Sequence, residues 1–315
     1  MQAHPPPNAA QKESSGKRVV AHMVGGLGNQ MFIYASAWAL ARANKAELYL
    51  DTSGFARDFE YKRNFQLGHF QTGQKAKLKT FAAIDFAYRV WRKVAQKLPL
   101  LPMSVGPVLG ERLHLETLFD PAFRRGSLRE HQTLHVFGFR QNEKYFADYR
   151  AELLEEFAML LEPSAELREQ AEMIRNTESV SVNFRLLHET IPGTSIPKPN
   201  LKTLGARYYH HAVQAVLVQK RDPVFYCFGD QIEGIEALMP AGAKIVKLPD
   251  TPDQPADIRD FWLMRQCKNF IIANSSYSWW AAWLGQRQDS MVICPDTEGF
   301  TYKIAPADGW IVVKP

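Results

Sequence analysis

The sequence predicts an α/β protein with parallel sheets, and three observations support that fold class. Residues 18–51 indicate a strand, a turn, a helix and a strand, and residues 260–285 indicate a helix, a strand, a turn and a helix. Between them, apolar runs of strand length alternate with segments of helical apolar spacing. This alternation is typical of parallel sheets covered by helices, and 315 residues suffice for two domains of ordinary size.

The first pattern starts with the apolar strand RVVAHMV and turns through Gly25–Gly28. Glycines at such a turn allow a ligand to approach the backbone closely. The helix that follows opens with Asn29 and Gln30, whose side-chain amides could reach an anion or a sugar. One face of this helix should pack on a sheet; it carries Met31, Tyr34, Ala35 and Trp38.

The same turn partly matches the dinucleotide-binding fingerprint, G-x-G-x-x-G followed by an acidic residue about 20 positions later. Gly26 and Gly28 fit, but Met31 stands where the third glycine belongs, and Asp51 lies somewhat late. A Rossmann-type NAD(P) oxidoreductase is therefore an open but less favoured alternative.

The middle of the chain follows the same spacing rules. Strands are predicted at Gln132–Phe139, Val180–Phe184, Pro223–Phe228 and, short and buried, at Lys244–Val246. Helices are predicted at Glu143–Leu161, Ala165–Arg175 and Tyr208–Lys220. The core-facing residues of the first of these helices are Tyr149, Leu153, Phe157 and Leu160. The turn-rich segment Leu186–Leu204 is expected to form a loop over the ligand site.

The segment Tyr88–Leu101 is basic and amphipathic. The favoured interpretation is a surface helix that packs Val90, Trp91 and Val94 inward. The alternative is a helix that lies on a membrane carrying a lipid-linked acceptor.

The second pattern, Asp260–Gly285, places a buried strand before Asn274–Ser278, a run of capping residues at a helix start. Unpaired N–H groups and the positive end of the helix dipole attract an anion, so this turn is a candidate phosphate site. The structural alternative is that the serines cap the helix while Trp279, Trp280 and Trp283 fill the core.

Two long motifs resemble a known family. GGLGNQMFIYA (25–35) and CKNFIIANSSYSWWAAWL (267–284) resemble the bacterial α-1,2-fucosyltransferases of glycosyltransferase family 11. Shorter matches follow the family's order at GFRQNEKYF (138–146), YCFGDQIE (226–233) and DGW (308–310). The resemblance implies a GT-B-like fold, with two Rossmann-like lobes and a cleft between them. It also implies inverting, metal-independent transfer of L-fucose from GDP-fucose to the 2-hydroxyl of a galactose-terminated glycan.

The family's H-x-R-R-x-D motif is altered in this chain. Its first, third, fourth and sixth positions are Asn183, Arg185, Leu186 and His188. By resemblance Arg185 holds the β-phosphate, and a guanidinium forks well onto phosphate oxygens; a structural ion pair is its alternative role. Because the aspartate is replaced, His188 and Glu189 are the local candidates for a general base, unless transfer proceeds with little base assistance. The change leaves the donor sugar and the acceptor open.

Further donor-binding candidates follow from the motifs. By resemblance Asn29 is an active-site residue, and Asp260 occupies the position that accepts guanine's N1–H and amine; a helix cap is the alternative for each. Asp230 is a weaker candidate, for nucleotide or turn. The complete predicted donor-binding set is Gly26, Gly28, Asn29, Gln30, Asn183, Arg185, Asp230, Asp260, Asn274, Ser275, Ser276 and Ser278.

No metal or other cofactor is expected besides the donor substrate. The chain has no Asp-x-Asp motif for a divalent ion, and the acidic run at residues 250–257 is interpreted as a solvated loop. Cys227, Cys267 and Cys294 each lie in or beside apolar runs and are expected to be buried free thiols in a reducing compartment.

Charge and termini bear on partners and location. A net charge of +5 and a pI near 9.0 suit an anionic nucleotide sugar or a membrane surface, and no basic run with interleaved aromatics indicates nucleic acid. Residues 1–17 lack the apolar core of a signal peptide and are expected to form a disordered tail. No stretch approaches a membrane span, so we expect a cytoplasmic protein, with peripheral contact at the inner membrane left open.

The domain prediction places an acceptor-side lobe at 18–163, a nucleotide-sugar lobe at 164–295 and a closing segment at 296–315. The acceptor is expected to be a galactoside oligosaccharide or a lipid-linked glycan. Two rivals besides the oxidoreductase stay open: a transferase with another GDP-sugar or acceptor, and a non-catalytic GDP-sugar-binding protein. No pattern indicates an oligomeric state.

Overall fold

The computed structural model describes residues 16–59, 61–95, 112–115, 128–185, 204–229, 234–251, 254–298, 300 and 303–315, with the backbone alone at 91–95 and 112–115. Predictions made for the tail before residue 16, for the loop at 186–203, and for His188, Glu189 and Asp230 lie outside these ranges.

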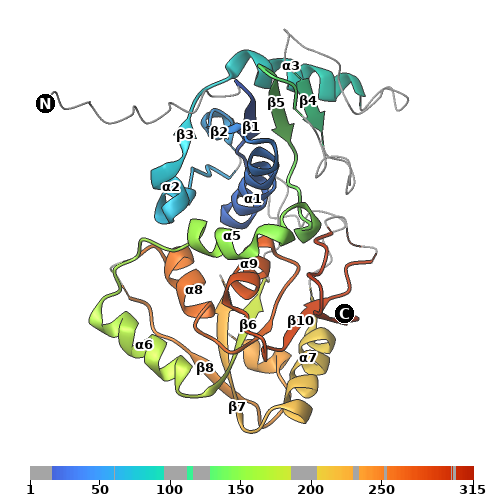
Figure 1. Ribbon diagram of the computed structural model, residues 1–315. Helices are drawn as coiled ribbons and strands as arrows, with labels where there is room; N and C mark the ends of the chain where they lie inside the picture. Colours follow the sequence, from blue (N-terminus) through green and yellow to red (C-terminus); the bar gives the residue numbers. More distant parts are fainter. Residues whose placement is uncertain are drawn as a thin grey trace, which may run out of the picture.

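The N-terminal lobe is a parallel sheet with the spatial order β3-β2-β1-β5-β4 (Figure 1). Its strands are β1 (Arg18–His22), β2 (Glu47–Asp51), β3 (Lys77–Leu78), β4 (Arg112–Leu115) and β5 (Thr133–Phe137). Its helical elements are α1 (Leu27–Asn44), η1 (Phe55–Arg57), η2 (Leu67–His69), α2 (Gln71–Lys75) and α3 (Ala82–Ala95).

The C-terminal lobe is a second parallel sheet with the order β8-β7-β6-β9-β10-β11. Its strands are β6 (Glu178–Phe184), β7 (Pro223–Gly229), β8 (Lys244–Lys247), β9 (Asn269–Ile271), β10 (Val292–Pro295) and β11 (Ile311–Val313). Its helical elements are α6 (Ala165–Arg175), α7 (Ala206–Gln219), η5 (Ile235–Leu238), α8 (Ala256–Met264) and α9 (Ser276–Gly285). The order is that of a doubly wound nucleotide-binding sheet. The expected GT-B-like architecture of two parallel α/β lobes is confirmed.

The two lobes share one aromatic core. Phe32 on α1 lies 4.6 Å from Trp279 and 5.1 Å from Trp280 on α9, measured between ring centroids. Phe146, which follows the N-terminal sheet, stacks on Trp280 at 5.2 Å. Trp283 donates its indole N–H to a carboxylate of the connecting segment, so its polar end is satisfied. The part of the structural alternative that places these tryptophans in the core is confirmed.

Helix α1 differs from the prediction of a single packing face. It is buried on nearly all sides, because the first sheet lies on one side of it and α9 on the other. The predicted stripe holds for Met31, Tyr34 and Ala35, which are buried, whereas Trp38 is half-buried. Helical periodicity marks one apolar face and cannot anticipate a second lobe on the opposite side.

The predicted helix at 143–161 is wrong in length. The segment forms two 3-10 turns, η3 (Glu143–Tyr145) and η4 (Ala147–Tyr149), before the short helix α5 (Arg150–Glu156), which lies between the lobes in Figure 1. The Glu143 carboxylate turns inward to accept from Trp283 and from the backbone N–H of Asp308, so the chain departs from helical geometry. Of the residues expected to face the core, two are buried and two are half-buried: Leu153 and Phe157, then Tyr149 and Leu160.

Two smaller predictions are corrected. Strand β8 is only half-buried, because it is an edge strand that pairs with β7 alone. On α3, Val90 is 47% exposed and Phe86 is 63% exposed, so Val90 does not pack inward as expected. The three cysteines are buried free thiols, as predicted, and burial raises the pKa of the Cys227 and Cys294 thiols to about 12.

A chain of buried polar side chains crosses the N-terminal sheet, from Asp51 at the end of β2 through His22 at the end of β1 to His135 within β5. Asp51 accepts from the His22 ring at 3.2 Å, and the other His22 nitrogen lies 2.9 Å from His135. Burial alone would raise the pKa of Asp51, but hydrogen bonds from His22 and Ser53 hold it at about 2. The carboxylate is therefore ionised, and its contact with His22 joins β2 to β1.

Replacing Asp51 with Asn should lower the free energy of unfolding by about 2 kcal/mol at neutral pH. Because the folded pKa lies below the unfolded one, this contribution is fully present above about pH 4 and is lost as the pH falls. The gap between native protein and Asp51→Asn in denaturant titrations should shrink to roughly half by about pH 3. A gap that stays constant from pH 6 to 3 would contradict this assignment.

Candidate functional site

Both sheets reverse their strand order at one place, between β1 and β5 in the first lobe and between β6 and β9 in the second. Ligands of open parallel sheets bind beyond the carboxyl ends of the strands at such switch points. The turn Gly25–Gly28 follows β1, and Gln141 follows β5. Arg185 follows β6, and Ser275 follows β9. Predicted site residues from distant parts of the sequence thus flank both switch points.

The two switch points meet where α1 and α9 begin. The backbone of Ser276 and Tyr277 lies directly against the α-carbon of Gly28, so closely that a Cβ there would overlap it. Glycine at position 28 is therefore required by contact between the lobes. Close approach of a ligand to this turn stays a prediction. Gly25 has φ +79°, a conformation that favours glycine, whereas Gly26 has ordinary dihedral angles.

Arg185 is half-buried at the end of β6. Among the described residues no carboxylate forms an ion pair with its guanidinium, so the structural alternative gains no support. Its neighbour Asn183 is buried, with its amide 3.5 Å from the Phe228 carbonyl and its own carbonyl accepting from the Tyr209 hydroxyl at 3.1 Å. These contacts join β6 to β7 and α7, and they set the position from which Arg185 extends.

The serines at the start of α9 have separate roles. Ser275 is the N-cap residue, yet its hydroxyl makes no capping hydrogen bond. Ser278 is fully buried, and its hydroxyl lies 3.2 Å from the Ser275 carbonyl and 3.4 Å from that of Ala273. This geometry contradicts a direct donor contact for Ser278. The hydroxyl of Ser275, a residue that is only 5% exposed, has no capping partner, and Ser276 is half-buried at the helix start.

The amides of Asn29 and Gln30 also differ. Gln30 is fully buried; its amide nitrogen donates to the carbonyls of Gly25 and Asn64, and its oxygen accepts from the Gln66 N–H, all within 2.9 Å. Its amide is thus occupied by the protein, which contradicts the predicted donor contact. Asn29 is half-buried, and its Oδ1 accepts from Gln141 at 2.8 Å, across the first switch point.

Helix-cap alternatives for Asn29 and Asp260 are excluded by position. The N-cap of α1 is Gly26 and that of α8 is Pro255. One oxygen of Asp260 accepts two hydrogen bonds from Arg259, at 2.6 and 2.8 Å. Burial raises the pKa of Asp260, although the Arg259 guanidinium opposes that shift. Recognition of guanine by Asp260 stays a prediction.

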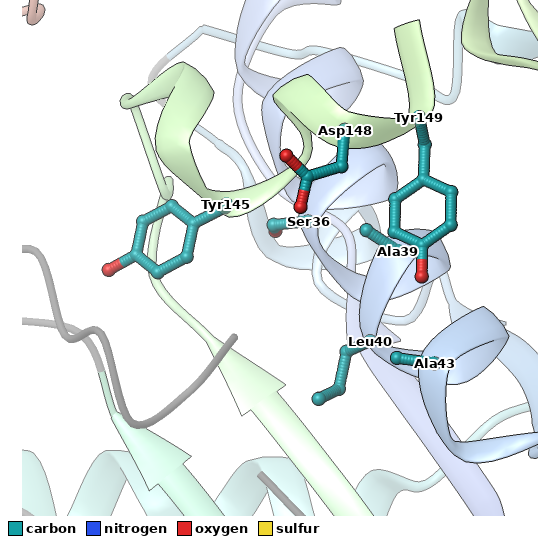
Figure 2. Close-up of a pocket in the computed structure, with 7 residues that line it drawn as sticks. All are labelled: Ser36, Ala39, Leu40, Ala43, Tyr145, Asp148 and Tyr149. Carbon is teal, nitrogen blue, oxygen red and sulfur yellow. The ribbon is translucent and has the colours of Figure 1, made fainter. Parts of the chain in front are cut away.

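Two surface cavities help to locate the site. One lies at the carboxyl ends of β9 and β10 and is lined by Asn274 and Ser275, together with apolar residues such as Ile272, Trp279 and Pro295. The other, shown in Figure 2, lies between the C-terminal half of α1 and η4, where Asp148 and Tyr149 line it. No predicted site residue lines this second cavity, and at 1.5 Å per residue its nearest α1 residue is about 12 Å from Gly28 along the helix axis.

The model of the family described as Glycosyl transferase family 11 matches residues 114–311, which is more than half of the chain. The chain belongs to glycosyltransferase family 11.

Similar proteins of known activity come from Escherichia coli. An alpha-1,2-colitosyltransferase is 29% identical over 280 residues, covering 88% of this chain and 91% of its own. The O-antigen biosynthesis glycosyltransferase WbnK is 29% identical over 290 residues, covering 86% and 91%. Among solved structures, NodZ alpha-1,6-fucosyltransferase soaked with GDP-fucose aligns with a TM-score of 0.48 and 10% identity, over 90% of this chain and 97% of that chain.

Family membership and geometry both disfavour the oxidoreductase alternative. A dinucleotide site needs a free carboxylate after the second strand to bind the ribose. In this glycosyltransferase that residue is Asp51, which is buried and bonded to His22, Ser53 and the Phe81 N–H. Met31 fills the position of the missing third glycine and is fully buried.

Two findings concern the described part of the enzyme only. Within it, no three His, Cys, Asp or Glu side chains gather in a way that could hold a metal ion. None of its helices combines the length and apolar character needed to cross a bilayer. Sequence patterns missed Gln141, although it lies inside the motif GFRQNEKYF, because its role depends on Asn29 in a distant segment.

Replacing Gly28 with Ala should separate the starts of α1 and α9 and lower the free energy of unfolding by about 1–3 kcal/mol. Gly26→Ala is the matched control, because its Cβ would meet only the Arg63 guanidinium, at an ordinary 3.7 Å. Thermal and denaturant unfolding of the two variants should differ clearly. Equal stability of Gly28→Ala and Gly26→Ala would contradict the lobe contact.

Proposed function

We propose that this glycosyltransferase transfers L-fucose from GDP-fucose, with inversion and without a metal, to the 2-hydroxyl of a galactose-terminated glycan. The observation that supports the proposal most is that Arg185 and the start of α9 flank the switch point between β6 and β9. A guanidinium and a helix N-terminus at a nucleotide-binding edge suit a diphosphate. Family membership makes glycosyl transfer the reaction.

The chemistry follows from where charge develops. When the bond between fucose and the β-phosphate breaks, negative charge grows on the leaving diphosphate, and preorganised donors stabilise the transition state. Arg185 would bind the β-phosphate, and the Ser275 hydroxyl with the free N–H groups of α9 would bind the remaining oxygens. Asn29, which is held by Gln141, would approach from the other lobe, near the sugar.

The acceptor hydroxyl attacks from the face opposite the leaving group and must lose a proton. His188 and Glu189 are our candidates for this general base, with transfer driven mainly by leaving-group stabilisation as the alternative. The inference for both rests on the altered motif after Arg185. We keep Asp260 as the candidate for the guanine contact.

A second donor is favoured by a specific observation. One similar protein is an alpha-1,2-colitosyltransferase, and colitose is the 3-deoxy counterpart of L-fucose. A site that hydrogen-bonds the 3-hydroxyl would reject the deoxy sugar strongly, whereas an apolar pocket at that position would accept both. GDP-colitose therefore belongs beside GDP-fucose in every activity test.

The acceptor in this proposal is a galactoside oligosaccharide or a lipid-linked glycan. Helix α3 leaves Phe86 and Val90 exposed, an arrangement that suits shallow contact with a membrane surface. We therefore include peripheral contact with the inner membrane of a cytoplasmic enzyme in the proposal.

The test is acceptor-dependent GDP release from GDP-fucose, with EDTA present, across a panel of galactosides. Arg185→Ala should lower kcat/KM by about 100-fold or more, and Arg185→Lys by less, because lysine keeps the charge but not the fork. Arg168→Ala is the control, since Arg168 is exposed on α6 of the same lobe. Release that needs a divalent ion, or that Arg185→Ala does not reduce, would refute the proposal.

Ser275→Ala and Ser278→Ala form a matched pair. Because the Ser275 hydroxyl makes no capping bond, its loss should leave stability within about 0.5 kcal/mol and weaken GDP binding several-fold. Loss of the buried Ser278 hydroxyl should cost about 1 kcal/mol of stability with little effect on GDP affinity in the folded enzyme. Calorimetric binding and denaturant unfolding together check both, and the opposite pattern would exchange the two roles.

A further inference from the structure

Residues 58–59 and 61–66 belong to a loop that is folded against the glycine turn of the N-terminal lobe. Asp58 starts it: one carboxylate oxygen accepts from the Tyr61 N–H at 3.0 Å and the other from the Arg63 N–H at 3.2 Å. The buried Gln30 amide then ties Asn64 and Gln66 to α1. Several hydrogen bonds thus set the place of this loop before any ligand binds.

The loop presents the Arg63 guanidinium at the glycine turn. The guanidinium carbon lies 4.6 Å from the centre of the Tyr61 ring, and the group stands 3.7 Å from where a Cβ of Gly26 would be. Arg63 is half-buried, and none of the described carboxylates forms an ion pair with it. By contrast, Arg57, which directly precedes this loop, forms an ion pair with Asp85.

This placement puts two sources of positive potential side by side. Gly26 is the N-cap of α1, so the positive end of an 18-residue helix lies beside the Arg63 guanidinium. No acidic residue stands in the first turn of α1 to compensate. A guanidinium and a helix N-terminus that lie side by side both favour an anion, so the turn suits a negatively charged ligand.

The same loop reaches the second lobe. Gln66 donates to the Asp257 carboxylate at 2.5 Å, and the Asp257 carbonyl accepts from the Tyr277 hydroxyl on α9 at 2.5 Å. Gly28, two residues from Gly26, touches the backbone of Ser276 and Tyr277. Arg63 therefore lies on the N-terminal side of the helix start that holds the diphosphate in the proposed function.

We propose that Arg63 is a second cationic clamp for the diphosphate of the donor, supplied by the acceptor-side lobe. This inference rests on the proposed function, because it takes a nucleoside diphosphate as the ligand. Arg63 would bind the terminal phosphate, the group that gains charge as the sugar departs. Gln30 and Tyr61 are positioning residues, which hold the guanidinium at the turn.

The experiment compares calorimetric binding of GDP and GMP to the full-length enzyme, because GMP lacks the terminal phosphate. Arg63→Ala should weaken GDP binding about ten-fold and GMP binding less than about three-fold, and Arg63→Lys should lie between native protein and Arg63→Ala. Arg129→Ala removes the same charge from an exposed site that precedes the amino end of β5, whereas the glycine turn follows the carboxyl end of β1, and it should leave both affinities unchanged. Unfolding temperatures that match the native value confirm that each variant is folded.

The outcomes separate the two proposals. GDP binding by Arg63→Ala at native strength, or an equal loss of GDP and GMP, would overturn the role of Arg63 and leave the proposed function standing. Failure of the native enzyme to bind GDP at all would overturn the donor assignment and this inference with it. A selective loss of GDP affinity supports both.

Discussion

The contact between the α-carbon of Gly28 and the backbone of Ser276 and Tyr277 is the constraint on which the site depends. It brings the starts of α1 and α9 together, and each helix follows the switch point of its own sheet. Any side chain at position 28 would separate them. Because the Phe32 ring packs on Trp279 and Trp280 just behind this contact, the aromatic core of the two lobes depends on the same spacing.

This contact also restrains motion of the two lobes relative to one another. Domains joined by small polar interfaces move relative to one another by default, whereas large apolar interfaces restrain them. Here the connecting segment adds polar ties, because Glu143 binds both Trp283 and Asp308. The chain after β10 adds more, since Trp279 donates to the Ala305 carbonyl at 2.9 Å. We infer that the site is largely preorganised, as electrostatic stabilisation of a leaving group requires.

The strands and most helices could be predicted from the sequence because their burial is periodic and local. The predictions are wrong where contacts with segments distant in the sequence determine the local structure. Glu143 interrupts a helical pattern because Trp283 draws it inward, and α1 is buried on two sides because a second lobe covers it. Both serines belong to the same motif, so the sequence could not distinguish their roles. The difference lies in their hydrogen bonds: the Ser278 hydroxyl bonds to the Ser275 carbonyl, whereas the Ser275 hydroxyl makes no capping bond. The motif likewise predicts a ligand contact for Gln30, because two of its actual partners, Asn64 and Gln66, lie 34 and 36 residues away in the sequence.

The distribution of charge favours a mechanism governed by the leaving group. A departing diphosphate needs about the charge that one divalent cation would supply, and in the proposed site two guanidiniums, Arg185 and Arg63, bring the same formal charge. The two helix starts add partial positive charge in the same direction. Each guanidinium comes from a different lobe, so full stabilisation requires both lobes in contact. If Arg185 and Arg63 bind the diphosphate as proposed, the Gly28 contact has a catalytic consequence, because it fixes the spacing of the lobes that supply the two guanidiniums.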